Sequence, residues 1–294
     1  MTLREAIIQN ELLISDGGMG TELQKLGLEL NCCADEWCLK YPDRVAAIHR
    51  KYVDAGSQLI TTSTFNSNRF ALTKHDLADK QAETARAGAR IAKEAMAGRG
   101  WVLGDVGPCG DLLEPLGAVK PDQLRESLKV QIGALLEGGA DAILLETMSS
   151  MDEVAIGLAV ARELNAPFVI VTAAFNPGKS GPRTMMGTKP ETLARLAAEE
   201  GADMGGANCG KLTRESDFLL LIERMRAAAP LPVMLQPNAG EPEMSDGQIV
   251  YRCGPADLAE RLAPIANQVK ILGGCCGSTP DHIRAIHDRL RPAH

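Results

Sequence analysis

The stretch QLRESLKVQIGALLEGGADAILLETMSSMDEVAIGLAVARELNAPFVIVTAAF, residues 123–175, decides the fold class. Residues 123–140 and 151–165 carry apolar side chains three or four positions apart with charges between them, the pattern of amphipathic helices. The runs AILLET (142–147) and PFVIVTAAF (167–175) are short, apolar and β-prone. A helix, a strand, a helix and a strand in succession predict a parallel sheet covered by helices.

The same alternation continues on both sides of this stretch. The other β-prone runs are LLISD (12–16), QLITTST (58–64), WVLGD (101–105), ADMGGANC (202–209), PVMLQPN (232–238) and VKILGGCC (269–276). Further helical patterns occupy 43–56, 81–98 and 190–201. Eight strands alternating with helices close a (β/α)8 (TIM) barrel, for which about 250 residues are typical. We therefore predict one domain over residues 1–294, a (β/α)8 barrel, with a doubly wound open sheet as the alternative.

The composition excludes several functional classes. The net charge is −7 and no stripe of Lys and Arg stands out, which argues against a nucleic-acid-binding protein. No apolar stretch approaches the roughly 20 residues of a membrane span, and the N-terminus lacks a signal-peptide pattern. We therefore expect a cytoplasmic protein with no nucleic-acid or membrane partner. In such a chain, its eight cysteines favour metal binding or catalysis over disulfides.

Four long stretches that read as non-helical follow predicted strands. They are residues 17–43, 107–122, 176–190 and 239–255. In a barrel these βα loops gather at the C-terminal ends of the strands, where active sites of such barrels lie. We therefore expect the functional site at that face.

Three cysteines lie at the ends of two predicted strands. GANCG (206–210) carries Cys209, and GGCCG (273–277) carries Cys275 and Cys276. Both strand ends open onto the same face of a barrel, so three thiolates can meet there, and three protein ligands with one open position are typical of a catalytic zinc. The alternative is that these cysteines are small buried core residues. Cys32, Cys33, Cys38, Cys109 and Cys253 lie on loops and are expected to be incidental thiols.

The donor set indicates which chemistry such a zinc would support. With three thiolates the site carries a formal charge of −1, which makes it a poor activator of water. It can instead bind a substrate thiol and keep it as a thiolate at neutral pH. The chain also lacks the HExxH motif of zinc hydrolases. A reaction in which substrate sulfur is the nucleophile is therefore favoured.

Two carboxylates and two glycines lie at other predicted strand ends. Asp16 ends the first run and Glu146 lies at the end of the run 142–147. Together they would hold an ammonium group, while the amides of Gly17 and Gly18 would hold a carboxylate. The alternatives are that Asp16 caps a turn and that Glu146 pairs with a Lys or Arg.

Other strand-end signals are weaker. Thr61–Thr64 would add hydroxyl groups for a ligand or be a β-prone threonine strand. Asp105 and Asn238, each followed closely by a glycine, are strand-end signals of the same kind or, alternatively, turn devices.

These motifs resemble those of one family over essentially the whole chain. The matching segments are DGGMGTEL (16–23), residues 42–65, GDVGPCGDLLEPLG (104–117), LLETMSSMDEV (144–154), GANC (206–209), QPNAGEP (236–242) and GGCCGSTPDHI (273–283). The chain is similar to the homocysteine S-methyltransferases, which include betaine– and S-methylmethionine–homocysteine methyltransferases and the homocysteine-binding module of cobalamin-dependent methionine synthase.

The resemblance implies a fold, a metal and a substrate. It implies a (β/α)8 barrel with Zn²⁺ on Cys209, Cys275 and Cys276, and methyl transfer to the zinc-bound thiolate of homocysteine to give methionine. The implied substrate-binding residues are Asp16, Gly17, Gly18, Thr62, Glu146 and Asn208. No catalytic residue beyond the zinc site is implied.

The methyl donor is less well defined by the resemblance. The betaine enzymes hold a quaternary ammonium between aromatic side chains, but this chain has Asn66 and Thr147 at two of those positions, and Trp37 is displaced. The stretches GPCGDLLEPLG and ETMSSMDEV are more similar to the methionine synthase module. We expect a methylcorrinoid, such as methylcobalamin carried by a separate protein, or a small sulfonium or ammonium compound such as S-methylmethionine or betaine; the first is favoured.

Two other functional classes were considered. The first is a thiol- and zinc-binding subunit of a corrinoid methyltransferase complex that acts on another thiol. The second is a metal-free barrel enzyme such as an aldolase, which would need a lysine at a strand end. None of the eight predicted strand ends has one.

Overall fold

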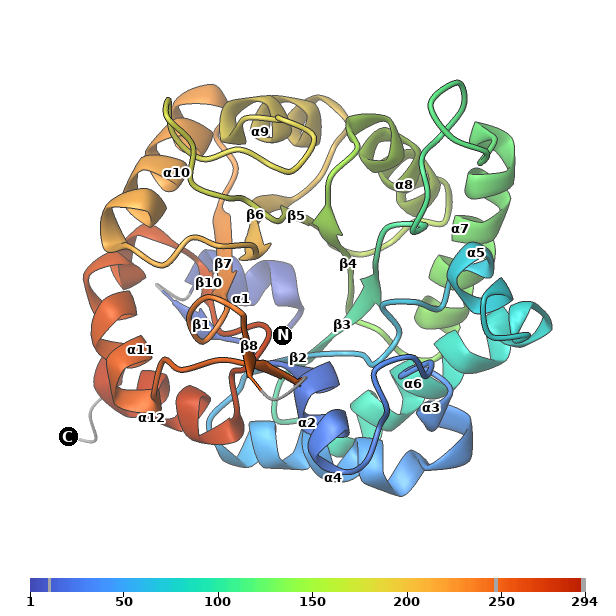
Figure 1. The fold of residues 1–294 in the computed structure, drawn as a ribbon, viewed down its shortest axis with the longest axis horizontal. Coiled ribbons are helices and arrows are strands. Elements are labelled where there is room, and N and C mark those ends of the chain that lie inside the picture. The colour runs from blue at the N-terminus through green and yellow to red at the C-terminus, as the bar shows by residue number, and fades with distance from the viewer. Residues whose placement is uncertain (10–11, 246–247, 292–294) are drawn as a thin grey trace.

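Eight parallel strands form a nearly closed barrel surrounded by helices (Figure 1). The computed structural model describes residues 1–9, 12–245 and 248–291. The barrel strands are β1 (Leu13–Ile14), β2 (Leu59–Thr61), β3 (Trp101–Val106), β4 (Ala142–Met148), β5 (Val169–Ala173), β6 (Met204–Cys209), β7 (Val233–Pro237) and β10 (Ile271–Leu272). Their hydrogen-bonded order is β1-β10-β7-β6-β5-β4-β3-β2, so each strand lies beside its neighbours in sequence. The predicted (β/α)8 fold is confirmed, and the doubly wound alternative is wrong.

An outer ring of helices covers the barrel (Figure 1). Its main members are α4 (Pro42–Asp54), α6 (Gln81–Met96), α7 (Pro121–Glu137), α8 (Met151–Glu163), α9 (Pro190–Glu199), α10 (Glu215–Ala228), α11 (Pro255–Leu262) and α12 (Pro280–Leu290). The helices predicted over 43–56, 81–98, 123–140, 151–165 and 190–201 match five of them to within three residues at each end. No helix among the described residues is long and apolar enough to cross a membrane.

The barrel interior is filled with aliphatic side chains. Leu103, Leu144, Ile170 and Met204, from four strands, belong to one buried cluster. Helix α1 (Leu3–Gln9) contributes Leu3, Ala6 and Ile7 to the same cluster. Because these residues pack into the N-terminal half of the barrel, α1 closes that end. The functional face is therefore the opposite one.

The ends of the sheet meet between β1 and β2. The amide of Gln58 donates to the carbonyl of Ile14 at 2.7 Å. Further along the seam, the amide of Thr61, three residues after Gln58, donates to the carboxylate of Asp16, two residues after Ile14, at 2.7 Å. A side chain therefore takes the place of a backbone acceptor where the barrel closes.

The loops after the strands hold more regular structure than the sequence predicted. The stretch 17–43, which read as non-helical, contains α2 (Met19–Lys25) and α3 (Trp37–Lys40). Residues 239–255 contain the antiparallel hairpin of β8 (Glu243–Ser245) and β9 (Gln248–Val250), with residues 246–247 outside the described part. The short elements α5 (Arg69–Thr73), η1 (Ala78–Lys80) and η2 (Ala263–Gln268) complete the fold. Strands β1 and β10 are also shorter than predicted, with two residues each.

We predict that truncating the barrel interior destabilises the protein strongly. Ile170 is fully buried on the central strand β5, so Ile170→Ala leaves a cavity that its neighbours cannot fill. The expected loss in the free energy of unfolding is about 2–5 kcal/mol, measured by urea denaturation. Val130→Ala on the exposed face of α7 is the control and is expected to change stability by about 0.5 kcal/mol or less. Equal effects of the two substitutions would contradict this assignment of the core.

Candidate active site

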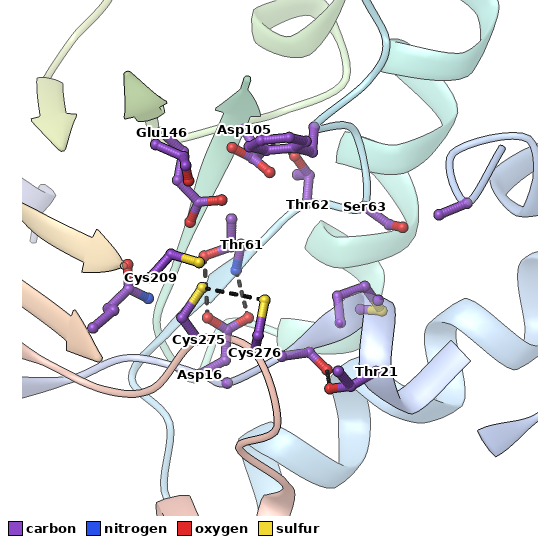
Figure 2. Close-up of a pocket in the computed structure, with 18 of the residues that line it drawn as sticks. Asp16, Thr21, Thr61, Thr62, Ser63, Asp105, Glu146, Cys209, Cys275 and Cys276 are labelled. Carbon is purple, nitrogen blue, oxygen red and sulfur yellow. Dashed lines mark hydrogen bonds between the residues drawn. The ribbon is translucent and has the colours of Figure 1, made fainter. Parts of the chain in front are cut away.

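A cavity of about 370 Å³ opens among the C-terminal ends of the strands. Its walls come from the ends of β1, β2, β3, β4, β6 and β10 and from the start of α2, so segments far apart in sequence meet there (Figure 2). It contains the three clustered cysteines and four carboxyl groups, those of Asp16, Asp35, Asp105 and Glu146. None of the residues that line it is a lysine, an arginine or a histidine. The cavity therefore has an excess of negative or acidic groups.

The sulfur atoms of Cys209, Cys275 and Cys276 lie within 4.8 Å of one another. Cys209 is the last residue of β6, and the other two lie in the turn after β10. The Cys275 and Cys276 sulfurs are 4.0 Å apart. The backbone of Cys209 has a φ of 52°, in the left-handed region that costs a non-glycine residue about 1–3 kcal/mol. The three half-buried thiols form the one such group of potential metal ligands found among the described residues.

The three thiols share their protons unequally. Hydrogen bonds from the Cys275 and Cys276 thiols lower the pKa of Cys209 to about 3. The same contact with Cys209 raises the pKa of Cys276 to about 12, and the pKa of Cys275 also lies well above its usual range. Within the cluster, Cys209 therefore ionises more readily than its two neighbours. A cation that replaces the thiol protons would be bound by all three sulfurs.

Two glycines allow the turn after β1 to approach the turn that carries Cys275. A Cβ on Gly18 would lie 2.8 Å from the carbonyl oxygen of Cys275, and one on Gly274 would lie 2.3 Å from Oγ of Ser278. The hydroxyl of Tyr52 donates to the carbonyl of Ser278 at 2.9 Å and fixes the same turn from the side of α4. These contacts hold the sulfur atoms beside the end of β1.

Asp16 is buried at the seam of the barrel. Its Oδ2 accepts from the amide of Thr61 at 2.7 Å, and its Oδ1 accepts from the hydroxyl of Thr61 at 3.0 Å. Burial raises the pKa of Asp16 to about 7, although both hydrogen bonds oppose this rise. Figure 2 shows its carboxylate directly beside the three sulfur atoms.

Glu146 and Asp35 are also acids with raised pKa values. Burial, followed by the nearby Cys209 sulfur and Asp16, raises the pKa of Glu146 to about 8. Burial raises the pKa of Asp35 to about 7, while its carboxylate accepts a hydrogen bond from the Ser67 hydroxyl at 2.8 Å. A positive charge entering the cavity beside Glu146 would lower the pKa of that carboxyl and be held by the resulting carboxylate.

Asn208 lies outside the cavity wall and instead supports it. Its Oδ1 accepts from the Thr147 amide at 3.0 Å and from the Thr172 hydroxyl at 2.8 Å, and its Nδ2 donates to the Thr147 hydroxyl at 2.6 Å. Thr147 has a φ of 60°, which is unusual for a β-branched residue. Asn208 therefore holds the strained end of β4 in place next to Glu146.

Thr62 and Gly18 line the cavity but already have protein partners. The hydroxyl of Thr64 donates to the Asp105 carbonyl at 2.8 Å. In the 2.6 Å hydrogen bond between the hydroxyls of Thr62 and Thr64, Thr62 is therefore the donor. Thr62 also accepts from the Asp105 amide at 2.9 Å, which leaves it one lone pair for a ligand. The amide of Gly18 donates to the Ser278 carbonyl at 3.1 Å. Of the two predicted glycine amides, that of Gly17 is the one without a protein acceptor among the described residues.

Four further residues contribute to this region. Asp105 and Asp35 line the cavity; the sequence marked Asp105 as a strand-end position, with a turn device as the alternative, and did not mark Asp35. Tyr251 and Asn238 form hydrogen bonds with the thiols of Cys276 and Cys209 respectively. The strand-end position of Asp105 and of Asn238 was the available signal; Asp35 and Tyr251 gave none because they lie within long loops.

The remaining cysteines and Trp37 lie apart from the sulfur cluster. Cys32, Cys33, Cys38, Cys109 and Cys253 are free thiols outside the group of potential metal ligands. Trp37 is buried, contacts Tyr41 edge-on at a centroid distance of 4.9 Å, and does not line the cavity.

Comparison with known proteins gives one family and two sets of relatives. A sequence profile of the family described as Homocysteine S-methyltransferase matches residues 13–290. The chain is 32% identical over 307 residues to a methionine synthase of Mycobacterium leprae (strain TN), and 31% identical over 299 residues to that of Mycobacterium tuberculosis (strain ATCC 25618 / H37Rv). These alignments cover 97% and 95% of this chain but 24% and 25% of the relatives, so the chain spans about a quarter of their length.

Solved structures agree on the fold. The metallated form of the homocysteine methyltransferase MmuM from Escherichia coli matches with a TM-score of 0.77 at 21% identity, over 98% of this chain and 99% of that one. The apo form of the same protein matches with a TM-score of 0.70. At this identity the likeness concerns the barrel alone.

We predict that Asp16→Asn changes how stability depends on pH. The folded protein keeps a proton on Asp16 up to about pH 7, whereas the unfolded chain loses it near 3.8. The stability contributed by this extra proton is full below pH 3.8 and is lost as the pH rises through 7. Asparagine retains an acceptor for the Thr61 amide without the ionisation.

The measurement is urea denaturation of the chelator-treated protein at pH 5 and pH 8. The stability of Asp16→Asn relative to the wild type is expected to increase between these two pH values. A difference that stays constant or falls would show that Asp16 ionises in the folded protein as readily as in the unfolded chain.

Proposed function

The chain belongs to the homocysteine S-methyltransferase family, and on this premise we propose that it is a zinc-dependent enzyme that transfers a methyl group to the thiolate of L-homocysteine, giving L-methionine. One observation carries the proposal: three thiols and four carboxyl groups line the same cavity, and no basic side chain lines it. Thiols are ligands for a soft metal, and buried carboxylates hold an ammonium group. An amino acid with a thiol supplies the ammonium group and brings its sulfur to the metal.

The three cysteines fit zinc by their chemistry. Thiolates at about 2.3 Å are common zinc ligands, and three protein ligands leave a position open for a substrate. The three sulfur atoms lie within 4.8 Å of one another, and hydrogen bonds from the other two thiols lower the pKa of Cys209. When bound, zinc supplies the positive charge that keeps a coordinated substrate thiol deprotonated at neutral pH.

The neighbouring residues support binding of the amino-acid part of homocysteine. Asp16 and Glu146 lie beside the sulfur cluster and would accept hydrogen bonds from the ammonium group. The free amide of Gly17 would donate to the carboxylate, and Thr62 retains one lone pair for the ligand. Asn208 would act indirectly, by holding the end of β4. Because these groups come from five different strand ends or turns, only the folded barrel presents them together.

The reaction then requires orientation more than acid–base catalysis. Asp16 and Glu146 would fix the amine end of homocysteine so that its sulfur lies at Cys209, Cys275 and Cys276. The cavity would exclude water and align the sulfur with the methyl group of the donor, which lowers the entropic part of the barrier. The methyl group moves to sulfur, and its bonding electron pair remains with the donor.

Two kinds of donor are compatible with this site. The methionine synthases to which the chain is similar are about four times longer, which leaves room in them for other domains. A methylcorrinoid, carried by another domain or by another protein, would therefore be one donor. A small sulfonium or ammonium compound, such as S-methylmethionine or betaine, would be the other.

We predict that the purified protein contains about one zinc per chain, because three cysteine ligands define one site. Cys275→Ser/Cys276→Ser is expected to lose this zinc, as measured by atomic emission and by competition with a chromogenic chelator. Cys253→Ser removes a half-buried cysteine outside the cluster and serves as the matched control with unchanged zinc. A wild-type content near zero, or unchanged zinc in the double variant, would refute the assignment of these ligands.

We predict that the enzyme makes methionine from homocysteine with at least one of three donors offered separately, betaine, S-methylmethionine or methylcobalamin. The reaction should disappear in the double cysteine variant and persist in Cys253→Ser, because only the first removes zinc ligands. Methionine is measured by mass spectrometry. Zinc and homocysteine binding without turnover on any donor would instead favour a thiol-binding subunit of a corrinoid methyltransferase complex.

A further inference from the structure

Asp105 is rigidly held at the end of β3, on the wall of the same cavity. Its amide donates to Thr62 at 2.9 Å, and its carbonyl accepts from the hydroxyl of Thr64 at 2.8 Å. Gln131 of α7 donates to the same carbonyl at 3.3 Å. Only 4% of the residue is exposed. Its backbone therefore has little freedom to move the side chain away from the cavity.

The carboxylate of Asp105, unlike those of Asp16 and Asp35, is incompletely satisfied. Its Oδ1 is buried and has no hydrogen-bond partner in the described part of the chain, whereas both oxygens of Asp16 are bonded to Thr61 and Asp35 accepts from Ser67. A buried acceptor without a partner is costly, so a native protein retains one where a ligand completes it. No residue lining the cavity carries a basic group that would do so.

Asp105 lies on the side of the cavity away from the sulfur atoms. Figure 2 shows it across from the three cysteines, beyond Glu146. The charged groups that act on it are Glu146, Asp35 and Asp16, with no sulfur among them, whereas Glu146 interacts first with Cys209. Glu146 and Asp16 are therefore placed to bind the amine of homocysteine beside the thiol cluster. Asp105 is placed to bind a second positive group, farther from the sulfur atoms.

An aromatic ring belongs to the same part of the wall. Phe65 lines the cavity, and its carbonyl accepts from the amide of Gly107 at 3.0 Å. A Cβ on Gly107 would lie 2.8 Å from the Phe65 ring, so the ring packs directly on the segment two residues beyond Asp105. A carboxylate and an aromatic ring are the two groups that attract an organic cation.

We propose that Asp105, assisted by Phe65, binds the positively charged atom of a small onium methyl donor, a methyl sulfonium or a methylated quaternary ammonium, and that Asp105 determines the preference for a charged donor. The proposal rests on the proposed function, because it places the donor opposite a sulfur nucleophile. It reverses the preference for a methylcorrinoid that the sequence suggested.

The geometry of displacement agrees with this placement. The homocysteine thiolate forms a bond to the methyl carbon as the bond from that carbon to the donor's S⁺ or N⁺ breaks. The bonding pair stays on the leaving atom, which becomes a neutral sulfide or amine. In an in-line transfer the leaving atom lies beyond the methyl group as seen from the nucleophile, which is the side where Asp105 is found.

The same reaction indicates how Asp105 would act kinetically. The thiolate and the onium both lose their charge during methyl transfer. The attraction between a nearby carboxylate and the donor is therefore at least as strong in the bound ground state as in the transition state. Such an interaction lowers KM for the donor without raising kcat. Asp105 is therefore a specificity-determining residue rather than an accelerating one.

The first test is equilibrium binding, which needs no turnover. Choline and 3,3-dimethylbutan-1-ol have the same shape, but only choline is charged, and each is titrated by calorimetry into the zinc-loaded protein with homocysteine. The wild type is expected to bind choline about tenfold or more tighter than the neutral alcohol. Asp105→Asn should reduce this ratio to about threefold or less, because it removes the charge and keeps the shape.

A matched variant separates Asp105 from the general acidity of the cavity. Asp35→Asn removes another buried carboxyl from the same wall, but one that already has a protein partner. This variant is expected to keep the wild-type preference for choline. Equal binding of the two compounds by the wild type, a preference that survives Asp105→Asn, or a loss caused equally by Asp35→Asn would overturn the proposal.

The second test is the split between KM and kcat with S-methylmethionine and with betaine, which distinguishes a sulfonium from an ammonium donor. Asp105→Asn is expected to raise KM for the active donor about tenfold, with kcat and the KM for homocysteine changed by less than about threefold. A fall in kcat at unchanged KM would contradict the assigned role. Turnover with methylcobalamin alone would overturn the proposal and leave the proposed function intact. Charge-selective binding without turnover on any donor would support the subsite and count against the proposed function.

Discussion

The hydrogen bonds between Asp16 and Thr61 are the interaction on which the site depends. The ladder of the barrel runs from β1 round to β2, and these two strands are joined by the Gln58 amide on the Ile14 carbonyl and by the Asp16 carboxylate on Thr61. Because the strand ends form a ring only when this seam is closed, the thiols and carboxyls converge only then. The same closure buries Asp16 and raises its pKa, so the fold and the chemistry of the site share one carboxylate.

Burying so many acids in one cavity constrains what it can bind. Burial raises the pKa of Glu146 to about 8 and that of Asp35 to about 7, and contact with Cys209 raises the pKa values of Cys275 and Cys276, so these groups favour their protonated forms. The proposed metal ion, ammonium group and onium would each replace protons with a fixed positive charge. Binding of one such cation would change the charge that the others meet, which would make the affinities for metal, acceptor and donor interdependent.

The sequence was sufficient for the barrel and for the residues gathered at its mouth, because strand ends in a parallel barrel all open on one face. It did not contain the contacts that individual side chains make. Asn208 was assigned to the substrate through the resemblance to family members; in the structure its amide holds Thr147 and also lies 3.9 Å from the Cys275 sulfur, beside the thiol cluster. The helices within residues 17–43 were missed because α2 and α3 have only seven and four residues, too short for a periodic pattern.

Asp105 illustrates what a sequence does not contain. An aspartate before Val-Gly-Pro has the composition of a turn, and many such carboxylates cap their own backbone. Here the hydroxyls of Thr62 and Thr64 bond the backbone of Asp105, and although the carboxylate accepts from the Val106 amide, its Oδ1 has no partner among the described residues. An aromatic cage binds an onium through the quadrupoles of its rings, and without a ligand it carries no desolvated charge. A buried carboxylate binds an onium through its charge, and without a ligand it favours the protonated form. Asn66 and Thr147, which stand where aromatic residues occur in the betaine enzymes, are therefore no argument against an onium donor, since a carboxylate on β3 meets the same requirement from another wall of the cavity.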